Sequence, residues 1–219
     1  MAEVIFIGLS LASILLLIAL GLTITYGAMG VINMAHGELV MIGAYTAVMA
    51  GIYLGANLLV ALPLAFVVAG GLGLLIERLV IRHLYGRILD TLLATWGIAI
   101  LLQQVIRLEF GLSFFDIHIE GLGPGLQNVS IPAFLNQAWM IGDFTVQPYR
   151  SFIILLTLAL TAMTWFLLYR TSLGIQVRAI MRNPDMAAAC GIDVKRVSAY
   201  TFAYGSGLAG VAGVMMAGF

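Results

Sequence analysis

Three polar residues that could contact a solute stand close together in an otherwise apolar part of the chain. The stretch GVINMAHGEL, residues 30–39, contains Asn33, His36 and Glu38. Apart from Glu38, residues 4–76 contain no charged side chain. An amide, an imidazole and a carboxylate at this spacing could line a solute pathway or act as its gate. They could also form a simple helix start, with Asn33 as N-cap and Glu38 in the favourable first turn.

A second set of polar residues lies in the stretch TLLATWGIAILLQQV. Within it, Thr95, Trp96 and Gln103 fall in a sector of about 100° at the helical period, while Gln104 points elsewhere. A hydroxyl and an amide inside a membrane need partners, either on neighbouring helices or on a polar solute in a pathway. Neutral hydrogen-bonding groups suit an uncharged, amide-like solute better than an ion.

None of these residues forms a pattern typical of an enzyme. His36 and Glu38 lack the second histidine of an HExxH zinc site, and the single cysteine, Cys190, can form neither an internal disulfide nor a thiolate metal site. The only lysine, Lys195, is followed by Arg196, so the chain has no GxxxxGK[ST] phosphate loop. We therefore expect no catalytic residue, no metal and no cofactor on this chain, and the energy for any active transport would have to come from elsewhere.

The composition places these residues in a membrane. Hydrophobic residues make up 62% of the 219 residues and charged residues 9%, and the mean hydropathy is +1.08. In soluble domains, by contrast, charged residues make up about a quarter of all residues. Because an apolar helix needs about 20 residues to cross the hydrocarbon core, the uncharged runs predict spans at 4–27, 33–54, 57–77, 88–109, 150–169 and 197–219. The fold class expected is all-α: a polytopic transmembrane helical bundle of about six spans, with 1–219 as a single domain.

The second span is predicted to begin near Asn33. A helix that started at Leu39 and ended near Leu54 would have only about 16 residues, which is short for a membrane span. Starting the helix earlier carries His36 and Glu38 into it, at or just inside the cytoplasmic boundary.

The basic residues orient the spans. Lysine and arginine concentrate in residues 78–87 and 170–196, whereas the segment 110–149 contains neither. By the positive-inside rule the two basic loops are cytoplasmic, so the N-terminus and the segment 110–149 lie outside. Glycines and prolines in this extracytoplasmic loop predict turns and a short hairpin.

Small residues predict close contacts between helices. They recur every four residues in the second span and in the last span, which is the small-xxx-small pattern of close helix packing. The residues are Gly43, Ala47 and Gly51 in the second span and Gly205, Ala209 and Gly213 in the last. Channels, transporters and membrane enzymes all use such rows, so the pattern predicts tight packing without a particular chemistry.

The loop 170–196 contains the signals of a short helix outside the membrane. Asn183 and Asp185 flank a proline and supply an N-cap and an acidic first turn, and Gly191 stands where the helix would end. Arg182 precedes this helix. The loop is either a docking element for a partner or a surface connector whose arginines anchor the inner leaflet.

Four motifs resemble those of one transporter family. GLTITYGAMGVINMAHGELVMIGAY, DTLLATWGIAILLQQVIR, RTSLGIQVRAIMRNPDMAAACGI and TFAYGSGLAGVAGV follow one another as in the permease subunits of branched-chain amino acid and urea ABC importers. The resemblance covers nearly the whole chain. In TLLATWG with LQQ, and in the run GSGLAG, it is closest to the urea permease branch.

The resemblance implies partners and a docking site. A permease of this kind pairs with a homologous second permease subunit, docks cytoplasmic ABC ATPase subunits and receives solute from an extracytoplasmic solute-binding protein. The ATPase-coupling pattern Glu-Ala-Ala-x-x-x-Gly maps onto Asp185, Met186, Ala187 and Gly191, with Asp and Met replacing Glu and the first Ala, and Arg182 lies just before it. The resemblance also favours a pathway or gate role for the polar residues at the start of the second span.

The function expected is therefore ATP-driven import of urea or a similar small amide across the inner membrane of a bacterium, without contact to nucleic acid. The alternative within the family is a branched-chain amino acid importer. A passive channel or ion-coupled carrier for a small polar solute is an alternative of another class, and it would not need a docking helix. Family members continue through further helices after the position of Phe219, so the chain is expected to be truncated.

Overall fold

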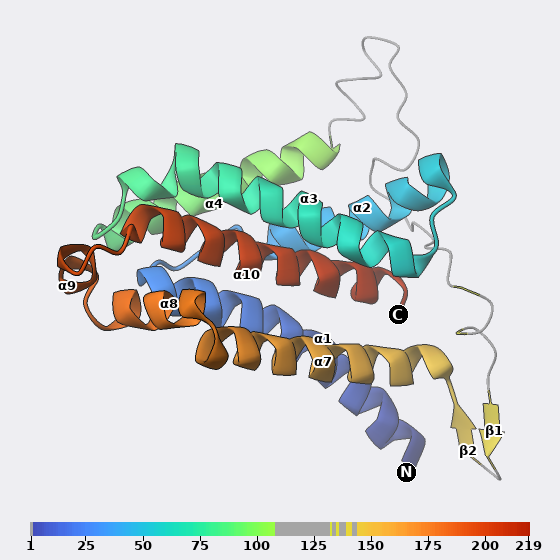
Figure 1. Cartoon of the computed structure of the whole chain (residues 1–219). Helices are drawn as coiled ribbons and strands as arrows, with labels where there is room; N and C mark the ends of the chain where they lie inside the picture. The colour runs from blue at the N-terminus through green and yellow to red at the C-terminus, as the bar shows by residue number, and fades with distance from the viewer. Residues whose placement is uncertain (1, 108–131, 133–134, 136–138, 142–143) are drawn as a thin grey trace.

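The computed structural model describes residues 2–107, 132, 135, 139–141 and 144–219 (Figure 1). Long helices lie side by side in one bundle, and a two-stranded hairpin precedes the fifth long helix along the chain. The elements are α1 (Ala2–Met29), α2 (His36–Leu54), α3 (Leu58–Leu79), the 3-10 helix η1 (Ile81–His83), α4 (Ile88–Arg107), β1 (Trp139–Ile141), β2 (Phe144–Val146), α7 (Pro148–Arg170), α8 (Ser172–Arg182), α9 (Pro184–Ala189) and α10 (Val194–Ala217).

The predicted helical membrane bundle is confirmed. Five helices in the described part of the chain are long and apolar enough to cross a membrane, namely α1, α2, α3, α4 and α7. The sixth predicted span is present as α10, which has 24 residues but is not among these five. Its glycine, serine and threonine residues lower its hydropathy, and this composition suits a helix that contacts other helices more than lipid.

The two ends of the bundle agree with the predicted topology. The N-terminus, the C-terminus and the β1–β2 hairpin lie at one end in Figure 1, and α9 and the α3–α4 connection lie at the other. The two basic loops are therefore on the same side, as the positive-inside rule requires. The predicted hairpin is confirmed as an antiparallel pair in which Met140 faces Thr145. Most of the predicted extracytoplasmic loop 110–149, including its EGLGPGL stretch, lies outside the described residues.

Helix α10 occupies the centre of the bundle and packs against α1, α2 and α3. Glycines make these contacts close. A Cβ added to Gly205 would lie 2.6 Å from the carbonyl oxygen of Gly21 on α1, and Gly43 of α2 faces the backbone of Gly210. Gly213 faces the backbone of α2 at Val40. Close backbone contacts therefore occur at Gly43, Gly205 and Gly213, and α10 makes them with several of its faces and not with one row.

The other small residues of the two rows differ in their burial. Ala47 and Ala209 are almost fully buried, in agreement with a packing role. Gly51 is half-buried near the outer end of α2. Helix α2 therefore approaches α10 most closely around Gly43, in the half of α2 that faces Gly210 and Gly213.

Candidate functional site: a broken helix start and a cytoplasmic helix

Helix α2 begins at His36, three residues later than predicted, and residues 30–35 form a non-helical link. Gly30 has φ +63°, and its amide donates to Tyr26 O at 2.7 Å, which ends α1. The link then runs back beside α1, so that Nε2 of His36 lies 3.0 Å from Ile18 O. Ile18 is eleven residues before the end of α1, about 16 Å along the helix at 1.5 Å per residue.

Measured from the cytoplasmic end of α1, His36 therefore lies about 16 Å inward, which is about half the thickness of a hydrocarbon layer of about 30 Å. Non-helical backbone at this depth is tolerated only where protein buries it or where it lines a cavity.

Asn33 does not act as the N-cap of α2. That position belongs to Ala35, which has no capping side chain. Asn33 is 4% exposed and its Oδ1 accepts the amide of Ala35 at 3.0 Å, which turns the chain into the helix. Among the described residues, Nδ2 of Asn33 and Nδ1 of His36 have no hydrogen-bond partner, although both atoms are buried. Two polar atoms at membrane depth are thus left available to a solute or a water molecule.

Two hydrogen-bonded contacts hold α4 against this broken start. Thr95 Oγ1 accepts the amide of Met34 at 3.2 Å, and its proton is shared between Leu92 O at 3.1 Å and Ile32 O at 3.4 Å. Further along α4, Gln103 Nε2 donates to Glu38 Oε1 at 2.6 Å. The structure thus brings the two predicted polar sets together, although they are more than 60 residues apart in sequence.

Trp96 is the exception. It lies on the edge of the predicted sector and is 56% exposed, on the outer surface of α4 together with Gln104. The sector was too wide because the buried face of α4 is narrow and centres on Thr91, Thr95 and Ala99. Only a long side chain such as Gln103 reaches inward from its edge. Trp96 is not part of the group formed by Glu38 and Gln103.

The side chain of Glu38 accepts a hydrogen bond through one of its two oxygen atoms, Oε1. Its side chain is half-buried in the first turn of α2, where the helix dipole favours a negative charge. The Gln103 amide is its hydrogen-bond donor, and no salt bridge to Glu38 is present in the described part of the chain. A carboxylate and an amide side by side can accept an ammonium group or the N–H groups of an amide.

Glu77 and Tyr85 form a buried polar pair that the sequence reasoning missed. Glu77, near the cytoplasmic end of α3, has no exposed surface, and its Oε1 accepts the hydroxyl of Tyr85 at 2.6 Å. Burial, and after it the hydrogen bond to Glu77, raises the pKa of Tyr85, against smaller effects from Ser198 and Arg82. A lone acid within a predicted span was the signal that could have found this pair.

A cavity of about 230 Å³ lies at the cytoplasmic end of the link. It is lined by residues 29–31 and by the start of α4, including Arg87 and Thr91. Two glycines with positive φ, Gly30 and Gly86, border it. On α4, Gln103, Thr95 and Thr91 follow one another toward the cytoplasmic end, and Thr91 lines the cavity.

A short helix is present at the predicted place in the loop 170–196, as α9. Asn183 Oδ1 accepts the amide of Met186 at 3.0 Å, and Pro184 occupies the first turn. After the helix, Gly191 has φ +86°, which a residue with a Cβ rarely adopts. Asp185 and Arg182 are exposed and Ala187 is buried. The geometry presents a capped helix at the cytoplasmic end, and its role in coupling stays a prediction.

Helix α8, which was not predicted, carries α9. Thr171 caps it by accepting the amide of Gly174 at 3.2 Å. Its buried side, which includes Val177 and Ile180, packs in a small core with Ala187 and Val197. The spacing of the apolar residues within the loop 170–196 is the sequence signal that could have predicted α8. Because of this core, α9 is fixed to the start of α10 and does not hang on a free loop.

Comparison with known proteins finds relatives along nearly the whole chain. Residues 4–218 match the family described as branched-chain amino acid transport system / permease component. The high-affinity branched-chain amino acid transport system permease protein LivH of Escherichia coli (strain K12) is 34% identical over 229 residues, covering 98% of this chain and 70% of that protein.

Two further relatives extend this result. The corresponding permease protein BraD of Pseudomonas aeruginosa is 30% identical and covers 95% of this chain and 68% of its own length. The probable branched-chain amino acid transport permease protein LivH of Methanocaldococcus jannaschii is also 30% identical, with 94% of this chain and 62% of its own length covered. No solved structure matches the chain.

The fold and the site define a multi-pass membrane protein whose interior holds polar side chains beside the non-helical link between α1 and α2. The chain belongs to the family of permease components of branched-chain amino acid ABC transport systems.

Proposed function

We propose that this chain is a membrane-spanning permease subunit of an ATP-driven importer, and that its solute passes between the broken start of α2 and the inner face of α4. The Glu38–Gln103 hydrogen bond of 2.6 Å at membrane depth is the observation that carries the pathway. Apart from this bond and the contacts of Thr95, α4 has few contacts with the bundle. A solute that replaced this bond would therefore loosen α4 from α2.

The proposal includes the partners expected from the family. Energy comes from ABC ATPase subunits that dock at α9, since this chain has no phosphate loop. A second permease subunit completes the pathway, and an extracytoplasmic binding protein delivers the solute at the end that carries the hairpin. The membrane is the inner membrane of a bacterium, and ATP is bound by the partners only.

The proposed solute is a branched-chain amino acid. The names of the relatives support this alternative better than the urea branch that the motifs favoured. Glu38 would accept the ammonium group of the amino acid. Urea or a short amide is the second candidate, supported by the TLLATWG and LQQ motifs and by the carboxylate and amide of Glu38 and Gln103, which match amide N–H and C=O groups.

The test compares Gln103→Leu with Gln104→Leu in the complete importer reconstituted with its partners. Intramembrane hydrogen bonds are worth about 0.6 kcal/mol on average and at most about 1.7 kcal/mol, and about 1.4 kcal/mol corresponds to tenfold. We expect Gln103→Leu to raise the half-saturation concentration for the transported solute by roughly threefold on average and by at most about fifteenfold. Gln104 is the matched control, because it is the neighbouring glutamine and is exposed.

Uptake is measured with labelled leucine and labelled urea, each with the other as competitor and each with and without ATP. Saturable, ATP-dependent uptake of leucine would support the first solute, and that of urea the second. Uptake that persists without ATP and partner subunits would instead indicate a passive channel. Lower thermal stability of Gln103→Leu with an unchanged half-saturation concentration would assign Gln103 to packing and contradict the pathway.

A further inference from the structure

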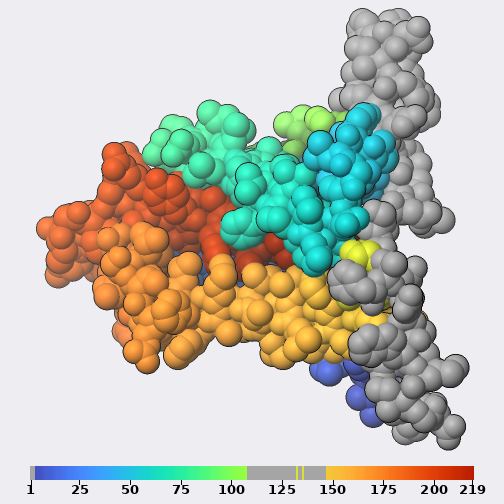
Figure 2. Space-filling view, turned by 45° about the vertical axis from the view of Figure 1, so that its right-hand side comes forward, coloured from blue at the N-terminus to red at the C-terminus, as the bar shows by residue number. Residues whose placement is uncertain are grey.

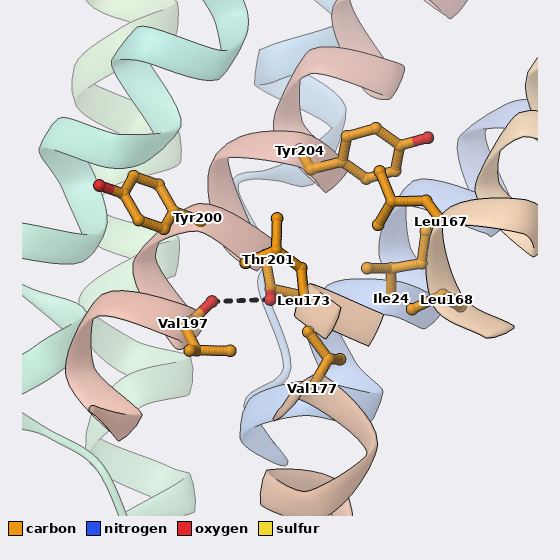
Figure 3. Close-up of a pocket in the computed structure, with 9 residues that line it drawn as sticks. All are labelled: Ile24, Leu167, Leu168, Leu173, Val177, Val197, Tyr200, Thr201 and Tyr204. Atoms are coloured by element: carbon orange, nitrogen blue, oxygen red, sulfur yellow. Dashed lines mark hydrogen bonds between the residues drawn. The ribbon is translucent and has the colours of Figure 1, made fainter. Parts of the chain in front are cut away.

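An apolar crevice opens on the bundle between α1, α7, α8 and α10 (Figure 3). Its volume is about 280 Å³. Ile24, Leu167, Leu173 and Val177 contribute apolar walls from three helices, and Thr201 lies among them on α10. The crevice lies near the cytoplasmic ends of these helices, because Leu167 is three residues before the end of α7, or about 5 Å along it.

In the interior of the crevice the hydroxyl groups of Thr201 and Tyr204 are paired, and the hydroxyl of Tyr200 points away from the crevice in Figure 3. Thr201 Oγ1 donates to Val197 O at 2.7 Å, as the dashed line in Figure 3 shows. The hydroxyl of Tyr204 is paired with Thr164 Oγ1 at 2.7 Å. A polar solute would lose its hydration here without gaining partners. The occupant that fits these walls is a hydrocarbon chain.

A second apolar groove of about 310 Å³ runs along the other side of α10, between α10 and α3. Phe66, Val67 and Leu74 line it from α3. Tyr200 and Tyr204 border both hollows and form the ridge between them. Figure 2 shows the surface of α10 between α3 and α7, where these hollows lie. Two apolar grooves on either side of one ridge match the two acyl chains of a phospholipid.

Basic side chains stand at the cytoplasmic end of these grooves. About one helical turn beyond the lining residues, each of three helices has an exposed arginine: Arg78 after Leu74 on α3, Arg170 after Leu167 on α7, and Arg196 before Tyr200 on α10. Arg196 pairs with Asp193 at 3.0 Å, but both side chains are exposed, so this pair leaves the arginine accessible. Basic pockets between helices on the cytoplasmic side bind anionic lipid head groups.

We propose that this part of the surface binds an anionic phospholipid of the cytoplasmic leaflet. Its acyl chains lie in the two grooves beside the Tyr200–Tyr204 ridge, and its phosphate lies among the three arginines. The charge complementarity distinguishes this occupant from a zwitterionic lipid, and the lack of free polar groups in the crevice distinguishes it from a transported solute. The site is separate from the pathway at Glu38 and Gln103.

The experiment is native mass spectrometry of the purified complete importer after exchange into phosphatidylglycerol or phosphatidylethanolamine with identical acyl chains. We expect phosphatidylglycerol to be retained preferentially. The variant Arg170→Gln/Arg196→Gln should lower its retention, by about fivefold for each arginine, since a basic residue near anionic lipid contributes about 1 kcal/mol. Arg87→Gln is the control, because Arg87 is an exposed arginine at the same end of the bundle, at the start of α4.

A photo-crosslinking residue placed at Leu173, which is 49% exposed at the crevice, provides an independent readout. A crosslinked product with the mass of a phospholipid supports the proposal. Equal retention of the two lipids, or an equal loss in the double variant and in the Arg87 control, would overturn it. A crosslink to a polypeptide would also overturn it, since a protein helix would then occupy the crevice.

Discussion

Gly43→Ala tests whether the contact between α2 and α10 sets the stability of the bundle. An added Cβ would lie 2.5 Å from Cα and 2.6 Å from the carbonyl carbon of Gly210. Carbon atoms in contact are separated by about 3.5–4.0 Å, so the two helices must move apart by about 1 Å. The three atoms nearest to the new methyl group all belong to the backbone of Gly210 on α10, so no change of rotamer can relieve this overlap.

The size of the effect follows from overpacking. Extra methyl groups in a well-packed interior cost about 1–3 kcal/mol, and about 1 kcal/mol lowers the melting temperature of a chain of this length by roughly 2–4 °C. We expect Gly43→Ala to lower the apparent melting temperature by roughly 2–12 °C in detergent, measured by circular dichroism. Gly97→Ala is the control, because nothing lies within 4 Å of a Cβ at this position of α4. If the two variants melted alike, the close approach of α2 and α10 would not be a stabilising contact.

Two further predictions concern the cytoplasmic end. Tyr85→Phe removes the hydroxyl that donates to Glu77 and leaves this buried side chain without that hydrogen bond. It should lower the free energy of unfolding by about 1–3 kcal/mol, and adding Glu77→Gln should recover part of this loss. Thermal unfolding that stays unchanged in Tyr85→Phe would contradict the reasoning. Gly191→Trp places a bulky residue at φ +86° beside α9, so it should abolish pull-down of the ATPase subunit and uptake without preventing membrane insertion. Unchanged docking and uptake would mean that the loop is only a connector.

Much of the bundle could be predicted because single residues decide where membrane helices end. The uncharged runs placed the ends of the described helices within about three residues, since charged side chains are excluded from the hydrocarbon layer. Helix α9 was predicted from the side chain of Asn183 and from Gly191, because caps are local chemistry. These signals need no knowledge of distant contacts.

The depth of the candidate site could not be predicted in this way. The link 30–35 is non-helical although nothing in its own sequence forbids a helix, and its backbone is paired by Thr95, which is 61 residues away from Met34. Periodicity identified Gln103 as polar but could not show that Glu38 is its partner. It also could not place Trp96 on the exposed side of α4, since that depends on which neighbours the helix has.

The extended link also restricts the order in which the chain can be assembled in the bilayer. When α1 and α2 have been synthesised, Thr95 has not yet been made, so the amide of Met34 lacks the hydroxyl that accepts its hydrogen bond. An unpaired backbone group in lipid costs several kcal/mol. We therefore expect the link to stay in contact with water until α4 has been synthesised and packs against it.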